Sequence, residues 1–185
     1  GASGPVLQAP AGTYTVVITD SQGRSAMASG TIENDANCTT APVLVYVRAA
    51  LEGPYNASTG LMNDALRTLP TFPLNDPYPA LGYTHMGPGN TSTLSPVSLT
   101  TTGNDAIVDW VVLELRQEGS PSTRSATRHA LLQRDGDVVA LDGVSPVGFA
   151  VPPGNYHVAI RHRNHLGAMT LNAMPLTYAP TVIDL

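Results

Sequence analysis

The chain has 185 residues and a formal net charge of −5 at pH 7, and all nine of its basic residues are arginine. This acidic balance argues against nucleic acids and anionic membrane surfaces as partners. Only 12% of the residues are charged, whereas there are 16 prolines and 17 glycines. Surface helices need more Glu, Lys and Arg than this, so the composition predicts an all-β fold. The longest apolar run, residues 42–47, is too short for membrane insertion.

The first predicted element is a β-hairpin with arms at residues 13–20 and 25–32 around a turn at 21–24. Apolar and polar residues alternate along the first arm, as in a strand with one buried face. An isolated pair of strands buries too little apolar surface to be stable in water. We therefore expect the hairpin to pair with its own chain or with a neighbouring copy, through Tyr14, Val16, Ile18, Ala26, Ala28 and Ile32.

A polar joint at residues 34–42 separates this hairpin from the rest of the chain. We divide the chain into an N-terminal hairpin extension (1–36), a linker (37–42) and a main body (43–185). The single cysteine, Cys38, cannot form an internal disulfide and is interpreted as a tolerated thiol. The chain opens without Met or an apolar leader, so we expect a mature or excised form. Glycosylation sequons occur at Asn37, Asn56 and Asn90.

The body begins with an apolar run at residues 43–51, which predicts a central strand. Residues 53–104 follow with seven prolines and little periodicity. Only residues 61–69 have helix-like spacing, and we expect two helical turns at most. So long an irregular segment is either a binding surface or lid, or a proline-braced cover over the sheet.

Strand signals return after residue 105. Residues 106–116 predict a strand with Val111, Leu113 and Leu115 on one face. Residues 127–134 and 137–141 flank Asp135-Gly136, which indicates a two-residue turn with positive φ at both positions. Further strands are expected at 156–163, 168–171 and 176–183, the last two at sheet edges. Short strands separated by turns predict an antiparallel β-sandwich, Ig-like or jelly-roll-like.

The hairpin resembles the end of the repeat in large gliding-motility adhesins, which has the pattern Tyr-Thr-Val-x-Val-Thr-Asp-x-x-Gly-Cys-x-Ala-x-Ala-Ser-x-Thr-Ile. Arg24 stands where that family often has Cys, so this position cannot form a disulfide in the present chain. The residues that match or nearly match are Tyr14, Thr15, Val16, Ile18, Thr19, Asp20, Gly23, Ala26, Ala28, Ser29, Thr31 and Ile32.

Four stretches of the body are distinctive: residues 51–56, residues 108–116, residues 135–136 with 141–143, and residues 160–167. Through these stretches the body resembles a module near the C-terminal end of long bacterial surface proteins that are exported by the type IX route. The resemblance implies an extracellular or cell-surface location in a modular protein, and it implies no chemistry.

The densest polar cluster is residues 161–165, and a guanidinium that leaves water there needs a carboxylate partner. Arg161 or Arg163 is expected to pair with Asp109, Glu114 or Asp142, in a network with His162 and His165. A metal site is disfavoured because His157 and His162 have opposite parity on one strand. Alternatively, the same Arg and His residues could line a sugar site with Trp110, Tyr55, Tyr78 and Tyr83.

Catalysis finds little support in the sequence, and we expect no enzyme activity and no cofactor. Ser145 precedes Pro146, which lacks the N–H group that an oxyanion hole requires. Residues 135–137 and 34–37 could each hold Ca²⁺, but turn chemistry explains both.

Two functions fit these observations. The first is an extracellular structural or adhesive subunit that associates with itself by strand pairing, head to tail into a fibre. The second is a carbohydrate-binding module of a larger secreted protein, with surface glycans as partners.

Overall fold

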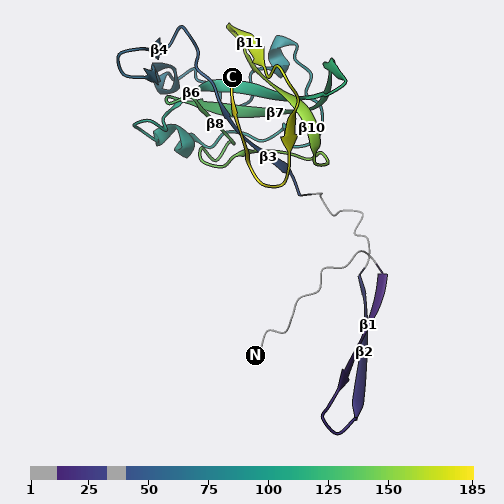
Figure 1. The fold of residues 1–185 in the computed structure, drawn as a ribbon. Helices are drawn as coiled ribbons and strands as arrows, with labels where there is room; N and C mark the ends of the chain where they lie inside the picture. The colour runs from purple at the N-terminus through teal and green to yellow at the C-terminus, as the bar shows by residue number, and fades with distance from the viewer. Residues whose placement is uncertain (1–11, 33–40) are drawn as a thin grey trace. The chain divides into compact units, whose positions relative to one another are not determined.

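The structure, a computed structural model, describes residues 12–32 and 41–185. The chain divides into two compact units, residues 1–39 and residues 40–185 (Figure 1). Strands account for 47% of the chain and helices for 7%, so the predicted all-β class is confirmed. Asn37, Cys38 and the 34–37 segment lie outside the described residues, and so does most of the predicted linker.

The first unit contains a two-stranded antiparallel ribbon, residues 12–32, which we call the hairpin ribbon. Strand β1 (Gly12–Thr19) pairs with β2 (Ser25–Ile32) without a register shift, from Gly12 opposite Ile32 to Thr19 opposite Ser25. Asp20 holds the turn because its carboxylate accepts hydrogen bonds from the backbone N–H groups of Gln22 and Arg24.

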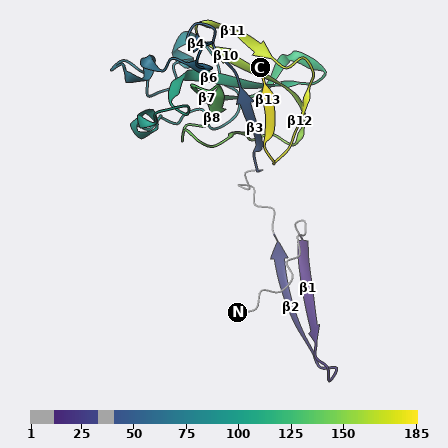
Figure 2. The same cartoon turned by 60° about the vertical axis from the view of Figure 1, so that its left-hand side comes forward.

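The second unit, which we call the body, is built on one nine-stranded sheet in the order β11-β10-β6-β7-β8-β3-β13. Strand β12 pairs with β10, and β9 pairs with β3. All pairings are antiparallel except β13 with β3 (Figure 2). The strands are β3 (Val43–Arg48), β6 (Ile107–Gln117), β7 (Ser120–Gln133), β8 (Asp137–Val139), β9 (Val147–Phe149), β10 (Gly154–His162), β11 (His165–Met169), β12 (Met174–Leu176) and β13 (Thr181–Asp184).

One hydrophobic cluster draws on strands from both halves of this sheet. The predicted face of Val111, Leu113 and Leu115 is confirmed, because all three are fully buried in this cluster. The cluster also includes residues of β3, β8, β10 and β13. Strand β3 approaches the β12 end of the sheet, where the Leu44 N–H donates to the Thr177 carbonyl. The sheet therefore curves around this core, and a sandwich arrangement stays a prediction.

The opposite face of β6 and β7 is covered by residues 63–104, which we call the cover. Its regular parts are three short 3₁₀ helices, η1 (Ala65–Thr68), η2 (Pro79–Leu81) and η3 (Pro96–Thr100). Tyr78 and Leu94 of the cover pack with Trp110 and Leu131 of the sheet in a second buried cluster. The cover also forms a hydrogen bond with Trp110, whose indole N–H donates to the Pro73 carbonyl at 2.8 Å. The proline-rich segment therefore protects one face of the sheet.

Residues 61–69 begin with the short strand β5 (Leu61–Met62), which pairs with β4 (Tyr55–Asn56), and then form the 3₁₀ helix η1. The limit of two helical turns is thus confirmed, but the helix does not include 61–62. Two further local predictions were wrong. Asp135 does not have positive φ; the N–H of Gly136 instead donates to the carbonyl of Gln133, with Gly136 at φ 97°. This is a turn followed by a left-handed glycine. The expected strand at 176–183 is split into β12 and β13.

Candidate functional site

The hairpin ribbon has two chemically different faces. Residues opposite each other in an antiparallel pair project to the same side. Tyr14, Val16 and Ile18 lie opposite Gly30, Ala28 and Ala26, which makes one face apolar, with large residues on β1 and small residues on β2. The other face carries three hydroxyl contacts, Thr13 with Thr31, Thr15 with Ser29 and Thr19 with Ser25. This second face also carries Val17 opposite Met27, which are 55% and 75% exposed, so it is mixed while the first face is wholly apolar.

Two large side chains of the apolar face are exposed in the described residues 12–32. Val16 is 58% exposed and Ile18 is 69% exposed. In the part of the chain that the structure describes, β1 pairs only with β2. The side chain of Ile32, the sixth residue proposed for association, lies outside the described residues. The five described residues, Tyr14, Val16, Ile18, Ala26 and Ala28, share this apolar face.

In the body, the structure brings the predicted polar residues together in two clusters. The Asp109 cluster consists of Asp109, His162, Arg163 and His165. The buried Asp109 carboxylate lies 3.0 Å from His162 Nε2, and Arg163 Nη2 donates to both of its oxygens at 2.9 and 2.8 Å. His162 Nδ1 lies 2.8 Å from His165 Nδ1 across the β10–β11 turn. This cluster fastens the turn to the first residues of β6.

The second cluster, which we call the Glu114 cluster, consists of Tyr83, Glu114, Arg116 and Arg161. Glu114 is fully buried, and its Oε1 accepts hydrogen bonds from Tyr83 at 2.6 Å and from Arg161 at 2.7 Å. Its Oε2 accepts from Arg116 Nε at 2.7 Å. Burial alone would raise the pKa of Glu114, but these hydrogen bonds and the two guanidinium charges outweigh burial and hold the pKa below its ordinary value. Glu114 is therefore a stable anion between two strands and the cover.

Burial also acts on the phenols of the cover. The pKa of Tyr83 is raised to about 12, first by burial and then by its hydrogen bond to Glu114. Burial likewise raises the pKa of Tyr78, whose hydroxyl donates to the Trp110 carbonyl at 2.9 Å and lies 3.3 Å from the Arg161 carbonyl. Both phenols are neutral donors at neutral pH, and their hydrogen bonds link the cover to the sheet.

Two of the four aromatic residues of the proposed sugar site have no open ring face, whereas Tyr55 is 45% exposed. Trp110 is completely buried, and Tyr78 is 4% exposed. A sugar ring needs the open face of an aromatic side chain, which neither residue presents. A groove of about 290 Å³ does lie beside the Glu114 cluster, between Arg116, Arg161 and Met169. The assignment of Trp110 to ligand binding is therefore wrong, and its alternative assignment to the core is correct.

Other sequence candidates have local roles. Asp142 takes no part in either cluster, because its carboxylate caps a turn by accepting from the N–H groups of Val144 and Ser145. Asp135 accepts from the Asp137 N–H in the same way, and Asp137 pairs with Arg48 at 3.0 Å. His157 faces the Thr170 carbonyl at 3.0 Å. Turn chemistry and strand pairing account for these side chains.

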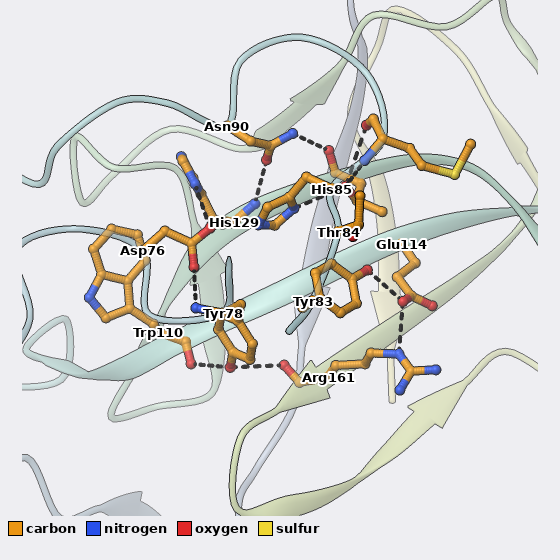
Figure 3. A network of polar contacts seen from close by, with 12 residues as sticks. Asp76, Tyr78, Tyr83, Thr84, His85, Asn90, Trp110, Glu114, His129 and Arg161 are labelled. Carbon is orange, nitrogen blue, oxygen red and sulfur yellow. Dashed lines mark hydrogen bonds and ion pairs between the residues drawn. The ribbon is translucent and has the colours of Figure 1, made fainter. Parts of the chain in front are cut away.

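The structure also assembles a third cluster, which the sequence did not reveal. Asp76 and His85 of the cover meet His129 of β7, and we call these three residues the Asp76 triad (Figure 3). Asp76 Oδ2 lies 2.6 Å from His85 Nε2 and 3.2 Å from His129 Nδ1. Their spacing carries no motif, and two of them lie in the irregular segment, so no sequence pattern pointed to them. Only the parity of β7, which puts His129 on the face of Leu131, offered a signal.

The charge state of the triad follows from its burial and contacts. Burial would raise the pKa of Asp76, but hydrogen bonds from His129, from the Tyr78 backbone N–H and from His85 hold it below the ordinary value. Burial lowers the pKa of His85, and the nearby Asp76 only partly offsets this effect. At neutral pH the triad therefore combines an aspartate anion with a neutral His85.

Comparison of the chain with protein-family models, with curated proteins and with solved structures finds no match. Among the described residues, no helix combines the length and the apolar composition that crossing a membrane requires. The geometry of the ribbon and of the body is therefore the basis for a functional proposal.

Proposed function

We propose that this chain is a structural subunit that assembles with copies of itself through its hairpin ribbon. The observation that carries this proposal is the exposure of apolar side chains on one face of the ribbon, where Val16 and Ile18 are both more than half exposed. A two-stranded ribbon is marginal in water until another surface covers one of its faces. An exposed apolar face on a strand pair is typical of a surface that packs on a partner.

The body does not need the ribbon for its own core. Every buried hydrophobic residue among the described ones lies between Val43 and Ile183. The body core is thus complete within its own unit, and the ribbon is available for a surface outside it. This supports a role in assembly rather than in folding of the body.

The body offers a complementary surface at the β11 edge of its sheet. In the described part of the chain, β11 pairs on one side only, with β10. Leu166 on this strand is 99% exposed. An open strand edge of this kind accepts an added strand.

A contact between a ribbon and the β11 edge of the next copy is heterologous. Such contacts do not close on themselves unless the rotation between copies closes a ring, and they otherwise build a filament. Export to a bacterial cell surface belongs to the same proposal, and the resemblances of the hairpin and the body support it. Because the structure buries Trp110 and Tyr78, no observation favours the carbohydrate-binding function as a second candidate.

Sedimentation velocity of the full chain over a range of concentrations tests the proposal. We expect species larger than a monomer. A double Val16→Thr and Ile18→Thr variant should weaken their association about tenfold or more, because it replaces apolar groups that the contact buries by hydroxyls. Leu166→Thr should weaken it from the other side of the contact.

The matched control is Val17→Thr, which makes the same kind of change on the opposite face, where Val17 is 55% exposed. This variant should associate like the natural chain. A natural chain that stays monomeric at every concentration would contradict the proposal, and so would an equal loss in the Val17→Thr control.

A further inference from the structure

The Asp76 triad joins the cover to the sheet through three side chains that are also metal ligands. We propose that Asp76, His85 and His129 bind one divalent transition-metal ion of the zinc type, which cross-links the cover to β7. One ligand atom from each residue, a carboxylate oxygen and two imidazole nitrogens, lies within 4.8 Å of the others. Among the described residues this is the only set of three that converges in this way.

One distance within the triad matches a tetrahedral site. Zinc binds nitrogen and oxygen at about 2.0–2.1 Å, which places two ligands of a tetrahedron about 3.3 Å apart. Asp76 Oδ2 and His129 Nδ1 are already 3.2 Å apart. His85 Nε2, at 2.6 Å from the same oxygen and within 4.8 Å of His129 Nδ1, has to shift by about 1 Å to admit the ion.

Outer partners already orient the ligands. The Tyr78 N–H donates to Asp76 Oδ1 at 2.9 Å, which leaves Oδ2 for the centre of the triad. His85 Nδ1 lies 3.0 Å from Thr127 Oγ1. Metal-bound imidazoles in proteins are held in the same way, by a partner at the second ring nitrogen. Two of the three ligands, Asp76 and His85, therefore have the outer partners that are typical of a metal site.

His85 and Thr127 can rearrange their protons when the ion binds without losing a hydrogen bond. In the absence of an ion, His85 Nε2–H donates to Asp76, and Nδ1 accepts from the Thr127 hydroxyl. When Nε2 binds the ion, the proton is carried on Nδ1 and donates to Thr127 Oγ1, whose own hydrogen turns toward the Met86 carbonyl at 3.4 Å. Every polar atom named here keeps a partner in both states, which is why the site can be formed before the ion arrives.

The ligand set selects the class of ion. The side chains of Asp76, His85 and His129 are only 7%, 10% and 3% exposed, so an ion there would be held mostly by these residues. Two imidazoles with one carboxylate suit zinc and related first-row ions better than Ca²⁺ or Mg²⁺, which prefer oxygen. A cavity of about 180 Å³ that is lined by His129, Arg128 and Gly89 gives room for water beside the triad.

The Asp109 cluster provides an internal contrast. It has two histidines and an aspartate as well, but His162 presents Nε2 to Asp109 and Nδ1 to His165. One imidazole cannot offer both nitrogens to a single ion, so these residues do not converge on one point. A buried histidine beside a carboxylate is therefore present in both clusters, while convergent ligands are present in one.

Titration of the full chain with Zn²⁺ against a chromophoric chelator at pH 7 tests the inference. We expect one Zn²⁺ per chain, and Asp76→Asn or His129→Gln should weaken binding by more than about 100-fold, since loss of an outer partner alone costs about 10- to 100-fold. His162→Gln is the matched control, because His162 is also buried beside an aspartate, and it should bind within about twofold of the natural chain. Equal affinity in Asp76→Asn, or an equal loss in His162→Gln, would overturn the proposal.

Nitrogen-15 NMR of the histidine rings of the natural chain gives a readout that does not depend on variants. Zn²⁺ should convert His85 from the Nε2–H to the Nδ1–H tautomer, and the midpoint of thermal unfolding should rise because the ion binds the folded chain. Ring signals of His85 and His129 that do not respond to one equivalent of Zn²⁺ would show adventitious binding elsewhere and would overturn the proposal. This result does not depend on whether the variants fold.

Discussion

Arg163 and Asp109 stand 54 residues apart in the sequence, and one guanidinium nitrogen of Arg163 contacts both carboxylate oxygens of Asp109, at 2.9 and 2.8 Å. Asp109 is 1% exposed, and His162 is its other charged or polar side-chain neighbour. A buried carboxylate gains most of its stability from such charged donors. This contact fixes where the β10–β11 turn meets β6.

Replacement of Arg163 by Ala should lower the free energy of unfolding by about 1.5–3 kcal/mol, because Asp109 loses a charged donor and keeps only His162 and the backbone. Urea unfolding followed by circular dichroism measures this loss. The control is Arg48→Ala, which removes a pair with Asp137 whose side chains are 56% and 47% exposed. Exposed pairs contribute about 0–1 kcal/mol, so equal losses in the two variants would contradict the assignment.

Glu114 predicts how stability depends on pH. Its pKa is lower in the folded chain than in the unfolded chain, so the unfolded chain binds more protons as the pH falls. The contribution of Glu114 is therefore complete above the unfolded pKa, about 4.3, and is lost as the pH falls through the lower folded value. Unfolding measured between pH 7 and pH 3 should show a shallower acid loss in Glu114→Gln than in the natural chain.

The exposed Glu52 supplies the comparison for that experiment. Glu52→Gln removes one negative charge at the surface and therefore controls for the change in net charge. A Glu114→Gln curve that is parallel to the curve of the natural chain would show that the Glu114 cluster does not shift protonation on folding.

Gly136 tests the unexpected turn between β7 and β8. It has φ 97°, and a Cβ atom there would lie 3.0 Å from the Ala49 carbonyl oxygen. Gly103 has a similar φ of 85° with no atom within 4 Å of the added carbon. Gly103→Ala should cost about 1–2 kcal/mol from the left-handed backbone alone, and Gly136→Ala should cost clearly more. Equal costs in urea unfolding would mean that Ala49 moves aside freely.

The sequence predicted those parts of the fold that depend on local alternation. Val111, Leu113 and Leu115 share a face because a strand has a period of two residues, and this rule needs no tertiary information. The pairings of Arg161 with Glu114 and of Arg163 with Asp109 were among those expected, because a buried guanidinium requires a carboxylate. The alternation within the hairpin likewise follows from the same period.

The sequence could not predict features that depend on distant packing. Asp76 and His85 lie in an irregular segment, and their meeting with His129 depends on how the cover folds over β7. The parallel pairing of β13 with β3 joins the two ends of the body, and no local pattern specifies it. At Asp135 the dipeptide signal correctly predicted a turn, but Gly136 also contacts Ala49, which directly follows β3 and lies outside the turn.

Hydrogen–deuterium exchange of the ribbon amides, residues 12–32, at several protein concentrations tests the central claim most directly. If the ribbon pairs with another copy, protection of these amides should rise with concentration, while protection of β6 and β7 stays constant. Ribbon protection that is the same at all concentrations would mean that the ribbon is covered within its own chain or not covered at all, and either result would contradict assembly through this surface.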